Sequence, residues 1–324
     1  MRPPTASATL DAGTLEQFAS DVAYYLSMHP RQLPSRYFYD GLGSALFEAI
    51  CQLPWYTITR AESRLIAAHG AEVFRVLGSF SSIVELGPGS GAKLRLLLEA
   101  AAGQRDVVQV HLVDISPSAL QVAAHTVGSL DSLHVRTHAA TYDAGLRDAT
   151  SQSNGRTLVA FLGSNIGNFD PPGASAFLHN VRTSLAAGDA LLLGVDLVKP
   201  EETLLLAYDD PLGITAAFNR NLLVRINREL GGDFDLEAFE HRAVWDADRS
   251  RVEMHLVARS AHQIHIPLAG LEFGVDRGET IWTESSYKYR PEDLVELLQP
   301  CGFRVAAQWI ETQDAFALTL AEAV

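Results

Sequence analysis

Hydrophobic and polar residues follow two different rhythms along the chain, and each rhythm predicts a type of structure. Between residues 81 and 198, short apolar runs alternate with segments that carry apolar residues at helical spacing. The predicted buried strands lie in 81–86, 107–116, 133–142, 157–163 and 190–198, and the helices between them include 117–130 and 174–188. Because strands that alternate with helices pair in parallel, this region predicts an α/β fold built on a parallel sheet.

Helical spacing continues on the N-terminal side of this region. It predicts a helix at 59–77 and a first helix at 14–28. The first helix follows a Thr14-x-x-Gln17 pattern that is typical of a capping box. We therefore expect order to begin near Thr14, after a flexible lead-in over residues 1–13.

The rhythm changes after Pro200. A helix is expected at 215–231, and residues 251–266 alternate between polar and apolar at period two, which predicts antiparallel strands with one face in solvent. The runs 304–310 and 315–321 predict a terminal hairpin that completes the parallel sheet. The break near Pro200 indicates a second domain.

Composition limits the classes of function. The 324 residues are 47% hydrophobic, enough for a large core in one or two domains, and 25 Lys+Arg against 39 Asp+Glu give a net charge of −14, which argues against nucleic-acid binding. Cys51 and Cys301 have no zinc spacing and make no disulfide framework. No apolar run approaches the ~20 residues of a membrane span, and the first residues lack the order of a signal peptide. We expect a cytoplasmic protein without a membrane partner.

The strongest local motif is the turn from Glu85 to Gly91, between a predicted strand and a predicted helix. Gly87 and Gly89 let the backbone approach a ligand, but the spacing differs from a dinucleotide fingerprint. Asp114 ends the next strand, where an acid can accept both hydroxyls of a ribose. The pattern is that of class I S-adenosylmethionine methyltransferases and predicts this adenosyl cofactor. The alternative is that the glycines only tighten a turn and that Asp114 caps a helix.

Two further residues near this motif have less specific signals. Lys93 lies in the first turn of the following helix, where it either approaches the methionine carboxylate of the cofactor or is solvated. His262 and His265 belong to a polar period-two strand, which explains them without a metal ion. We therefore expect no metal site.

Five longer motifs carry a resemblance over nearly the whole chain. They are PSRYFYDGLGSALFEAICQLPWYTITRAE (34–62), FLGSNIGNF (161–169), LLGVDLVKP (192–200), AYDDPLGITAAFNRN (207–221) and TESSYKYRPE (283–292). Together they resemble the histidine-specific, S-adenosylmethionine-dependent methyltransferases of ergothioneine biosynthesis. The resemblance implies stepwise Nα-trimethylation of L-histidine to trimethylhistidine (hercynine), without a metal.

The resemblance also implies an architecture. A class I, Rossmann-like methyltransferase domain is expected over 60–198 plus 287–324, and an α+β substrate-binding domain over 14–59 plus 199–286. The chain is expected to act as a monomer on a small-molecule substrate.

The family's amino-acid site maps onto Tyr56, Asn168 and Tyr208, with Tyr39 nearby. Phenol hydroxyls donate to a carboxylate, and the Asn carbonyl accepts from the amine and holds its lone pair toward the sulfonium. Methyl transfer is an in-line displacement that needs alignment more than a nucleophile, so Asn168 and Tyr39 are the catalytic candidates, the proton leaving to water or to Tyr39. The alternatives are core packing for the tyrosines and a turn role for Asn168.

The side-chain pocket of the family corresponds to Glu284 and Ser286, with Met254 and Thr215 close by. Two residues apart on a strand, Glu284 and Ser286 share a face. A carboxylate opposite an imidazole N–H selects histidine, because a wrong side chain leaves a buried acceptor unpaired. The alternative is that Glu284 is a solvated strand residue paired with Lys288.

The chain departs from the family where the adenine is expected. Thr141 and Tyr142 stand where the family has an acid followed by an aromatic residue, and Asp143 is the acid nearest in register. Competing functions are methylation of another amino acid such as tryptophan, and S-adenosylmethionine binding without catalysis.

Overall fold

The computed structural model describes residues 12–78, 80–100, 109–130, 133–153 and 155–324. The first eleven residues of the predicted lead-in lie outside the described residues. The described chain forms two compact units. The first unit contains the described residues up to Leu46, with Asp209–Val244 and Glu253–Glu284, and the second unit contains Phe47–Tyr208, Trp245–Val252 and Ser285–Val324. Whether these units are the two domains expected from the sequence stays a prediction.

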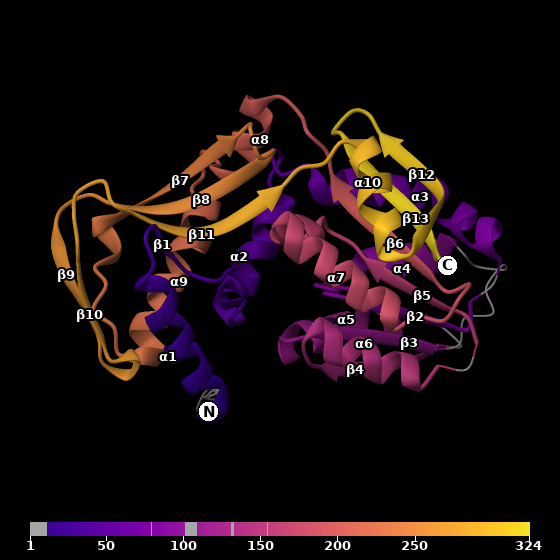
Figure 1. Ribbon diagram of the computed structural model, residues 1–324, viewed down its shortest axis with the longest axis horizontal. Helices are drawn as coiled ribbons and strands as arrows, with labels where there is room; N and C mark the ends of the chain where they lie inside the picture. Colours follow the sequence, from indigo (N-terminus) through magenta and orange to yellow (C-terminus); the bar gives the residue numbers. More distant parts are fainter. Residues whose placement is uncertain (1–11, 79, 101–108, 131–132, 154) are drawn as a thin grey trace, which may run out of the picture. The chain divides into compact units, whose positions relative to one another are not determined.

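The second unit is built on a seven-stranded sheet (Figure 1), and its strand order is β12-β13-β6-β5-β2-β3-β4. The strands are β2 (Ser82–Leu86), β3 (Gln109–Asp114), β4 (His134–Ala139), β5 (Thr157–Phe161), β6 (Ala190–Asp196), β12 (Phe303–Glu311) and β13 (Phe316–Ala323). Strands β2 to β6 pair in parallel, and β13 runs antiparallel to both β6 and β12. The predicted parallel sheet and its completion by a terminal hairpin are confirmed, and the order is that of a Rossmann-like fold.

The chain order of the strands locates the edge where a ligand is expected. From β2 the chain builds outward through β3 to β4, and then returns to the other side of β2 to add β5 and β6. In such open sheets, ligands bind outside the carboxyl ends of the strands at the point where the order reverses. That point lies between β2 and β5.

Two groups of helices cover the sheet, on opposite faces (Figure 1). One group contains α3 (Ile58–Leu77), α4 (Ala92–Ala100) and α5 (Pro117–Gly128); the other contains α6 (Tyr142–Ser151), α7 (Pro171–Thr183) and α10 (Pro291–Leu298). The apolar stripes of the second group close over Phe161, Leu193 and Phe303 of the sheet, all fully buried or nearly so. Helix α8 (Glu201–Tyr208) also belongs to this unit.

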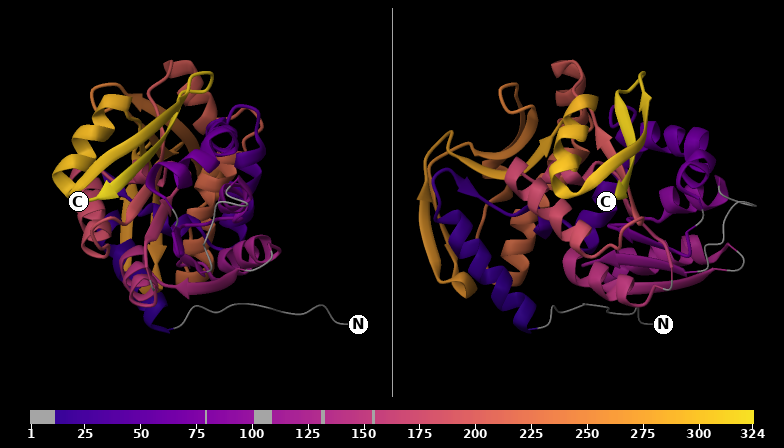
Figure 2. Two further views of the ribbon diagram at one scale, coloured as in Figure 1. Left: turned by 90° about the vertical axis from the view of Figure 1, so that its right-hand side faces the viewer. Right: turned by 45° about the vertical axis from the view of Figure 1, so that its right-hand side comes forward.

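The first unit contains α1 (Ala12–Leu26) and α9 (Ile214–Leu230). It also contains all or most of the residues of six strands, which form two small sheets. One sheet has the order β1-β11-β8-β7, from β1 (Arg31–Gln32), β7 (Phe239–Asp246), β8 (Arg251–Ala258) and β11 (Thr280–Tyr287). The other pairs β9 (His262–Ile266) with β10 (Leu271–Val275) in an antiparallel ribbon, which the right-hand view of Figure 2 shows in orange. Helix α2 (Gly41–Gln52) begins in this unit and ends in the second. The short 3₁₀ segments of the chain are η1 (Ser35–Phe38), η2 (Asn165–Asn168), η3 (Leu236–Ala238), η4 (Pro267–Ala269) and η5 (Gln299–Cys301).

Two local expectations are wrong. Helix α1 already includes Ala12, so Thr14 lies within its first turn, and the Gln17 side chain donates to Asp21 instead of closing a capping box. Strand β4 is mostly exposed, although the pattern predicted a buried strand. It is the terminal strand of its sheet, so only one neighbour covers it.

The helical spacing of Arg220, Arg225 and Arg228 predicts a solvated face of α9, but Arg225 is buried and only Arg228 is half exposed. Arg225 is 7% exposed, donates to the backbone carbonyl of Tyr37 at 2.9 Å, and places its guanidinium 5.0 Å from the centre of the Phe18 ring. Arg228 pairs with Asp40 at 2.7 Å. These side chains hold α9 to the N-terminal segments of the same unit.

Candidate functional site

The glycine turn after β2 leaves room for a ligand at the carboxyl edge of the sheet. Gly87 and Gly89 have φ angles of 71° and 53°, in the left-handed region that favours glycine. A Cβ at Gly87 would lie 2.8 Å from the Tyr142 hydroxyl, so this position has no room for a side chain. A Cβ at Gly89 would meet nothing nearer than 3.9 Å. The backbone at Gly89 is therefore the part of the turn that a ligand can approach.

Two acids flank this turn, as expected from the sequence. Glu85 is 2% exposed near the end of β2, and its Oε2 atom has no hydrogen-bond partner among the described residues. Burial raises the pKa of the Glu85 carboxyl to about 8. Asp114 ends β3, where burial also raises its pKa, and its Oδ1 accepts the Ser116 N–H at 2.8 Å. Asp114 thus orders the start of α5 and still lies at the edge where a ribose is expected.

Lys93 is only partly exposed, and it forms an ion pair that the sequence did not reveal. Its ammonium lies 2.5 Å from the carboxylate of Glu62, a residue of α3 whose side chain is 0% exposed. Both Glu62 oxygens also accept the N–H of Gly163, at 3.0 and 2.8 Å. Burial acts to lower the pKa of Lys93, but the Glu62 carboxylate outweighs it and holds the pKa above its usual value. Glu62 therefore ties together α3, α4 and the loop after β5.

The residues expected near the adenine occupy the start of α6. Thr141 is exposed at the N-cap position and makes no side-chain capping bond. Tyr142 packs edge-on against Phe161, with ring centres 5.5 Å apart, and burial raises the pKa of its phenol. Asp143 accepts a hydrogen bond from Asn180 of α7. The acid nearest in register is therefore engaged by its neighbouring helix.

A buried cluster of hydroxyl and charged groups lies at the carboxyl end of β6. The Tyr208 hydroxyl donates to Ser286 Oγ at 2.8 Å, which brings two of the expected substrate residues into direct contact. Lys288 Nζ donates to both hydroxyl oxygens, at 2.8 Å to Tyr208 and 3.0 Å to Ser286. It also pairs with Asp196 at 2.8 Å, and the Lys288 and Asp196 side chains are 0% and 1% exposed. We refer to these four residues as the lysine cluster.

Two other expected residues belong to the same unit as the lysine cluster. The Tyr56 ring lies edge-on to Tyr208, with ring centres 6.3 Å apart. Asn168 is the last residue of η2, which follows β5. A Cβ at Gly167 would lie 2.7 Å from the backbone carbonyl of Tyr287, so η2 and the end of β11 are in close backbone contact. Tyr56, Asn168, Tyr208 and Ser286 therefore gather at one edge of the second unit.

The remaining expected residues lie in the first unit. Met254 of β8 is buried, and its carbonyl accepts the Thr283 hydroxyl of β11 at 2.9 Å. Glu284 follows on β11, half-buried, and its carbonyl accepts the Trp282 indole N–H. Thr215 lies in the first turn of α9, and its N–H donates to Asp210 at 2.7 Å. Tyr39 packs edge-on against Phe218.

Sequence reasoning missed Asp196, Glu62 and the role of Lys288. Asp196 stands inside the quoted motif LLGVDLVKP, and Lys288 inside TESSYKYRPE, so both lay within segments already singled out. A charged residue at the end of a fully buried strand is the signal that identifies Asp196, because such a carboxylate needs a partner.

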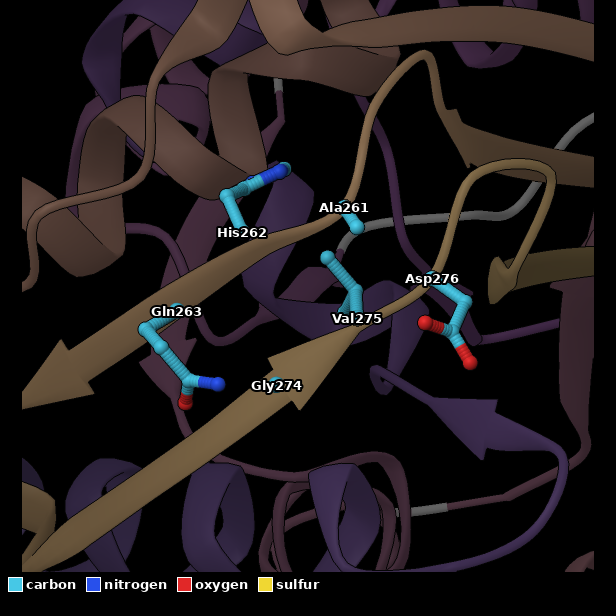
Figure 3. Close-up of a pocket in the computed structure, with 6 residues that line it drawn as sticks. All are labelled: Ala261, His262, Gln263, Gly274, Val275 and Asp276. Atoms are coloured by element: carbon cyan, nitrogen blue, oxygen red, sulfur yellow. The ribbon is translucent and has the colours of Figure 1, made fainter.

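A pocket elsewhere in the first unit carries none of the expected residues. It measures about 390 Å³ and lies at one end of the β9–β10 ribbon, lined by Ala261, His262, Gln263, Gly274, Val275 and Asp276 (Figure 3). In the described ranges, no three His, Cys, Asp or Glu side chains are grouped to hold a metal ion. Nor does any described helix combine the length and apolar character needed to cross a bilayer.

Comparison with known proteins gives consistent results over nearly the full chain. A family model described as "Histidine-specific methyltransferase, SAM-dependent" matches residues 18–323. The histidine N-alpha-methyltransferases of Mycolicibacterium smegmatis and Mycobacterium tuberculosis are 40% and 37% identical, over 94% and 96% of this chain and 95% and 96% of theirs. Ergothioneine biosynthesis protein 1 of Neurospora crassa is 32% identical over 86% of this chain and 32% of its own length.

Proposed function

Because the chain belongs to the family of histidine-specific, S-adenosylmethionine-dependent methyltransferases, we propose that it transfers three methyl groups in turn to the α-amino nitrogen of L-histidine. The protein is an enzyme of ergothioneine biosynthesis, and its methyl donor is S-adenosylmethionine. The observation that carries this function is the match of the family model from residue 18 to residue 323.

The carboxyl edge of the sheet suits the methyl donor. Gly89 leaves its backbone open to a ligand, and Glu85 has a buried oxygen without a partner among the described residues. We assign the cofactor to Glu85, Gly87, Gly89 and Asp114, with the adenine at Thr141 and Tyr142. When bound, S-adenosylmethionine supplies a methyl group on a positively charged sulfur, so the chain provides orientation and needs no covalent nucleophile. Lys93 remains the proposed contact of the methionine carboxylate, with its charge balanced by Glu62.

The tyrosines and Asn168 suit an amino-acid substrate. Tyr56 presents a phenol that donates to a carboxylate without adding a full charge. The Tyr208 ring lies edge-on to it and contributes its aromatic face, while its hydroxyl donates to Ser286. The Asn168 side-chain carbonyl accepts a hydrogen bond from the substrate α-amine and so directs the lone pair of the amine nitrogen toward the methyl group. Tyr39 or water takes the proton that the amine loses. We assign recognition of the imidazole to Glu284 and Ser286, and we propose Met254 and Thr215 as further substrate-binding residues. The aromatic rings also suit a substrate that becomes a quaternary ammonium ion.

Mass spectrometry after incubation with S-adenosylmethionine and L-histidine tests this proposal. The expected products carry one, two and three added methyl groups. An Asn168→Ala variant is expected to bind the cofactor product S-adenosylhomocysteine normally and to lose turnover. Cofactor binding by the unaltered protein without any methylated histidine would refute the proposed activity.

A second amino acid serves as the comparison substrate. Among the relatives is a 4-dimethylallyltryptophan N-methyltransferase of Epichloe festucae, 26% identical over 88% of this chain. Calorimetry in the presence of S-adenosylhomocysteine is expected to give tighter binding of L-histidine than of L-tryptophan. The reverse order would move the substrate assignment to tryptophan or a derivative.

We also propose that the enzyme acts as a cytoplasmic monomer. Its net charge of −14 opposes binding to nucleic acids and supports dispersal of single chains. Size-exclusion chromatography with light scattering is expected to give the mass of one chain, 35.2 kDa, and a stable dimer would contradict the monomer.

A further inference from the structure

The lysine cluster has a hydrogen-bonding pattern that follows from the chemistry of its members. An ammonium group only donates, so every atom that faces Lys288 Nζ must accept. The three acceptors are Asp196 Oδ2, the Tyr208 hydroxyl oxygen and Ser286 Oγ, all within 2.8 to 3.0 Å. Neither hydroxyl can therefore turn its hydrogen toward the lysine.

These constraints determine where the hydroxyl hydrogens of Tyr208 and Ser286 can point. Tyr208 uses its hydrogen in the bond to Ser286 Oγ. Ser286 Oγ then accepts from both Tyr208 and Lys288, which occupies its acceptor capacity. The hydrogen of Ser286 is left, and the bonds of the described chain assign it no acceptor. The cluster can thus offer a ligand one donor, on Ser286, whose own acceptor capacity is occupied.

The charges around the lysine cluster also favour a ligand atom that accepts a hydrogen bond. Asp196 is shared between two lysines, because its Oδ1 also pairs with Lys199 at 2.7 Å. One carboxylate facing two ammonium groups leaves an excess positive charge in a place where the side chains of Asp196, Lys199 and Lys288 are at most 7% exposed. A ligand group that accepts a hydrogen bond is favoured next to this charge, and a cationic group is disfavoured.

We propose that Lys288, anchored by Asp196, is a positioning residue that fixes the hydroxyls of Tyr208 and Ser286 so that Ser286 presents a single hydrogen-bond donor to an acceptor atom of the substrate. This inference rests on the proposed function, in which Tyr208 and Ser286 bind histidine. It adds a residue that acts through Ser286 and determines which protonation pattern of the substrate is bound.

The test compares two lysines that share one carboxylate. Lys288→Met removes the donor to both hydroxyls, and Lys199→Met removes the other partner of Asp196 without contacting either hydroxyl. Binding of L-histidine is measured by calorimetry in the presence of S-adenosylhomocysteine. We expect Lys288→Met and Ser286→Ala each to lower the affinity for L-histidine about ten- to hundredfold, since each leaves a buried polar group unpaired. Lys199→Met is expected to change histidine binding by less than about threefold, because Lys288 still pairs with Asp196 and donates to both hydroxyls.

A double variant separates positioning from a general structural role. Because Lys288 acts through Ser286, the double variant Ser286→Ala/Lys288→Met is expected to have about the same histidine affinity as the single variant that binds histidine more weakly. In steady-state kinetics, KM is expected to rise with kcat nearly unchanged, as for lost binding that is uniform through the reaction. Multiplied losses in the double variant, or equal effects of Lys199→Met and Lys288→Met, would overturn the proposal.

The controls keep the outcome interpretable. S-adenosylhomocysteine affinity reports folding of the sheet edge and is expected to stay constant. If Lys288→Met no longer binds S-adenosylhomocysteine, the variant Asp196→Asn/Lys288→Met replaces it, because this variant removes both charges of the pair together. Its histidine affinity is then compared with that of Ser286→Ala. If the unaltered protein fails to bind histidine, the proposed function itself is refuted. If the unaltered protein and Lys288→Met bind histidine equally, only the role of Lys288 is refuted.

Discussion

The buried pair of Glu62 and Lys93 makes a quantitative prediction for stability. Glu62→Gln keeps the shape of the side chain but places an amide where the Lys93 ammonium needs a carboxylate. Breaking a buried ion pair costs about 3–5 kcal/mol, and the partial exposure of the Lys93 side chain, 21%, reduces the expected loss to about 2–4 kcal/mol. The loss should appear in the free energy of unfolding measured by urea denaturation.

A surface pair provides the matched control. Glu99 pairs with Arg95 at 2.8 Å on α4, with side chains 44% and 43% exposed. Glu99→Gln is expected to change the free energy of unfolding by no more than about 0.5 kcal/mol. Both variants remove one carboxylate from an ion pair, so their difference reports the burial of the Glu62 carboxylate together with its bonds to the Gly163 N–H.

Removing both buried charges tests the cause. Glu62→Gln/Lys93→Met is expected to recover at least half of the loss, because no charge is then left uncompensated. If Glu62→Gln costs no more than Glu99→Gln, or if the double variant is less stable than the single one, Glu62 does not tie the helices and the Gly163 loop together as described.

Three further changes have defined outcomes. Gly194→Ala would place a Cβ 1.8 Å from Glu62 Oε1, so we expect it to destabilise by at least about 1–3 kcal/mol, whereas Gly128→Ala, with open space around it, should be nearly neutral in thermal unfolding. Burial lowers the pKa of His111 to about 4, so the unfolded chain binds the extra proton and stability should fall as the pH drops from about 6.5 to 4; a His111→Gln variant should show a weaker pH dependence of its melting temperature. Burial raises the pKa of Glu85 to about 8, so the folded chain keeps a proton that the unfolded chain loses, and stability without cofactor should fall as the pH rises from 4.5 to 8; Glu85→Gln should flatten that slope, and an unchanged slope would contradict the assignment.

The features that could be predicted from the sequence are those encoded within a short segment. The strand, glycine turn and helix from Ser82 to Ala100 form a local pattern, because period and turn residues act between neighbours. The same locality explains the confirmed terminal hairpin, whose two strands are separated by only a few residues.

The features that were missed depend on residues distant in sequence. Glu62 accepts from Gly163, and Asp196 pairs with Lys288, so neither partner carries a local sign of the other. Arg225 has the spacing of a solvated helix face, yet it is covered by Phe18 and Tyr37 from another part of the chain. Thr14 shows the opposite limit, because a local capping pattern was overridden by a helix that already includes Ala12.

The place of β13 in the sheet has a consequence for synthesis on the ribosome. Strand β6 pairs with β5 on one side, but its other neighbour, β13, is translated only after residues 209–284 have emerged. Until then the nascent chain presents the apolar edge ALLLGVD, a template for wrong pairing with other polypeptides. Slow decoding of the intervening codons would prolong that vulnerable interval, and a chaperone that shields β6 would raise the yield of native enzyme.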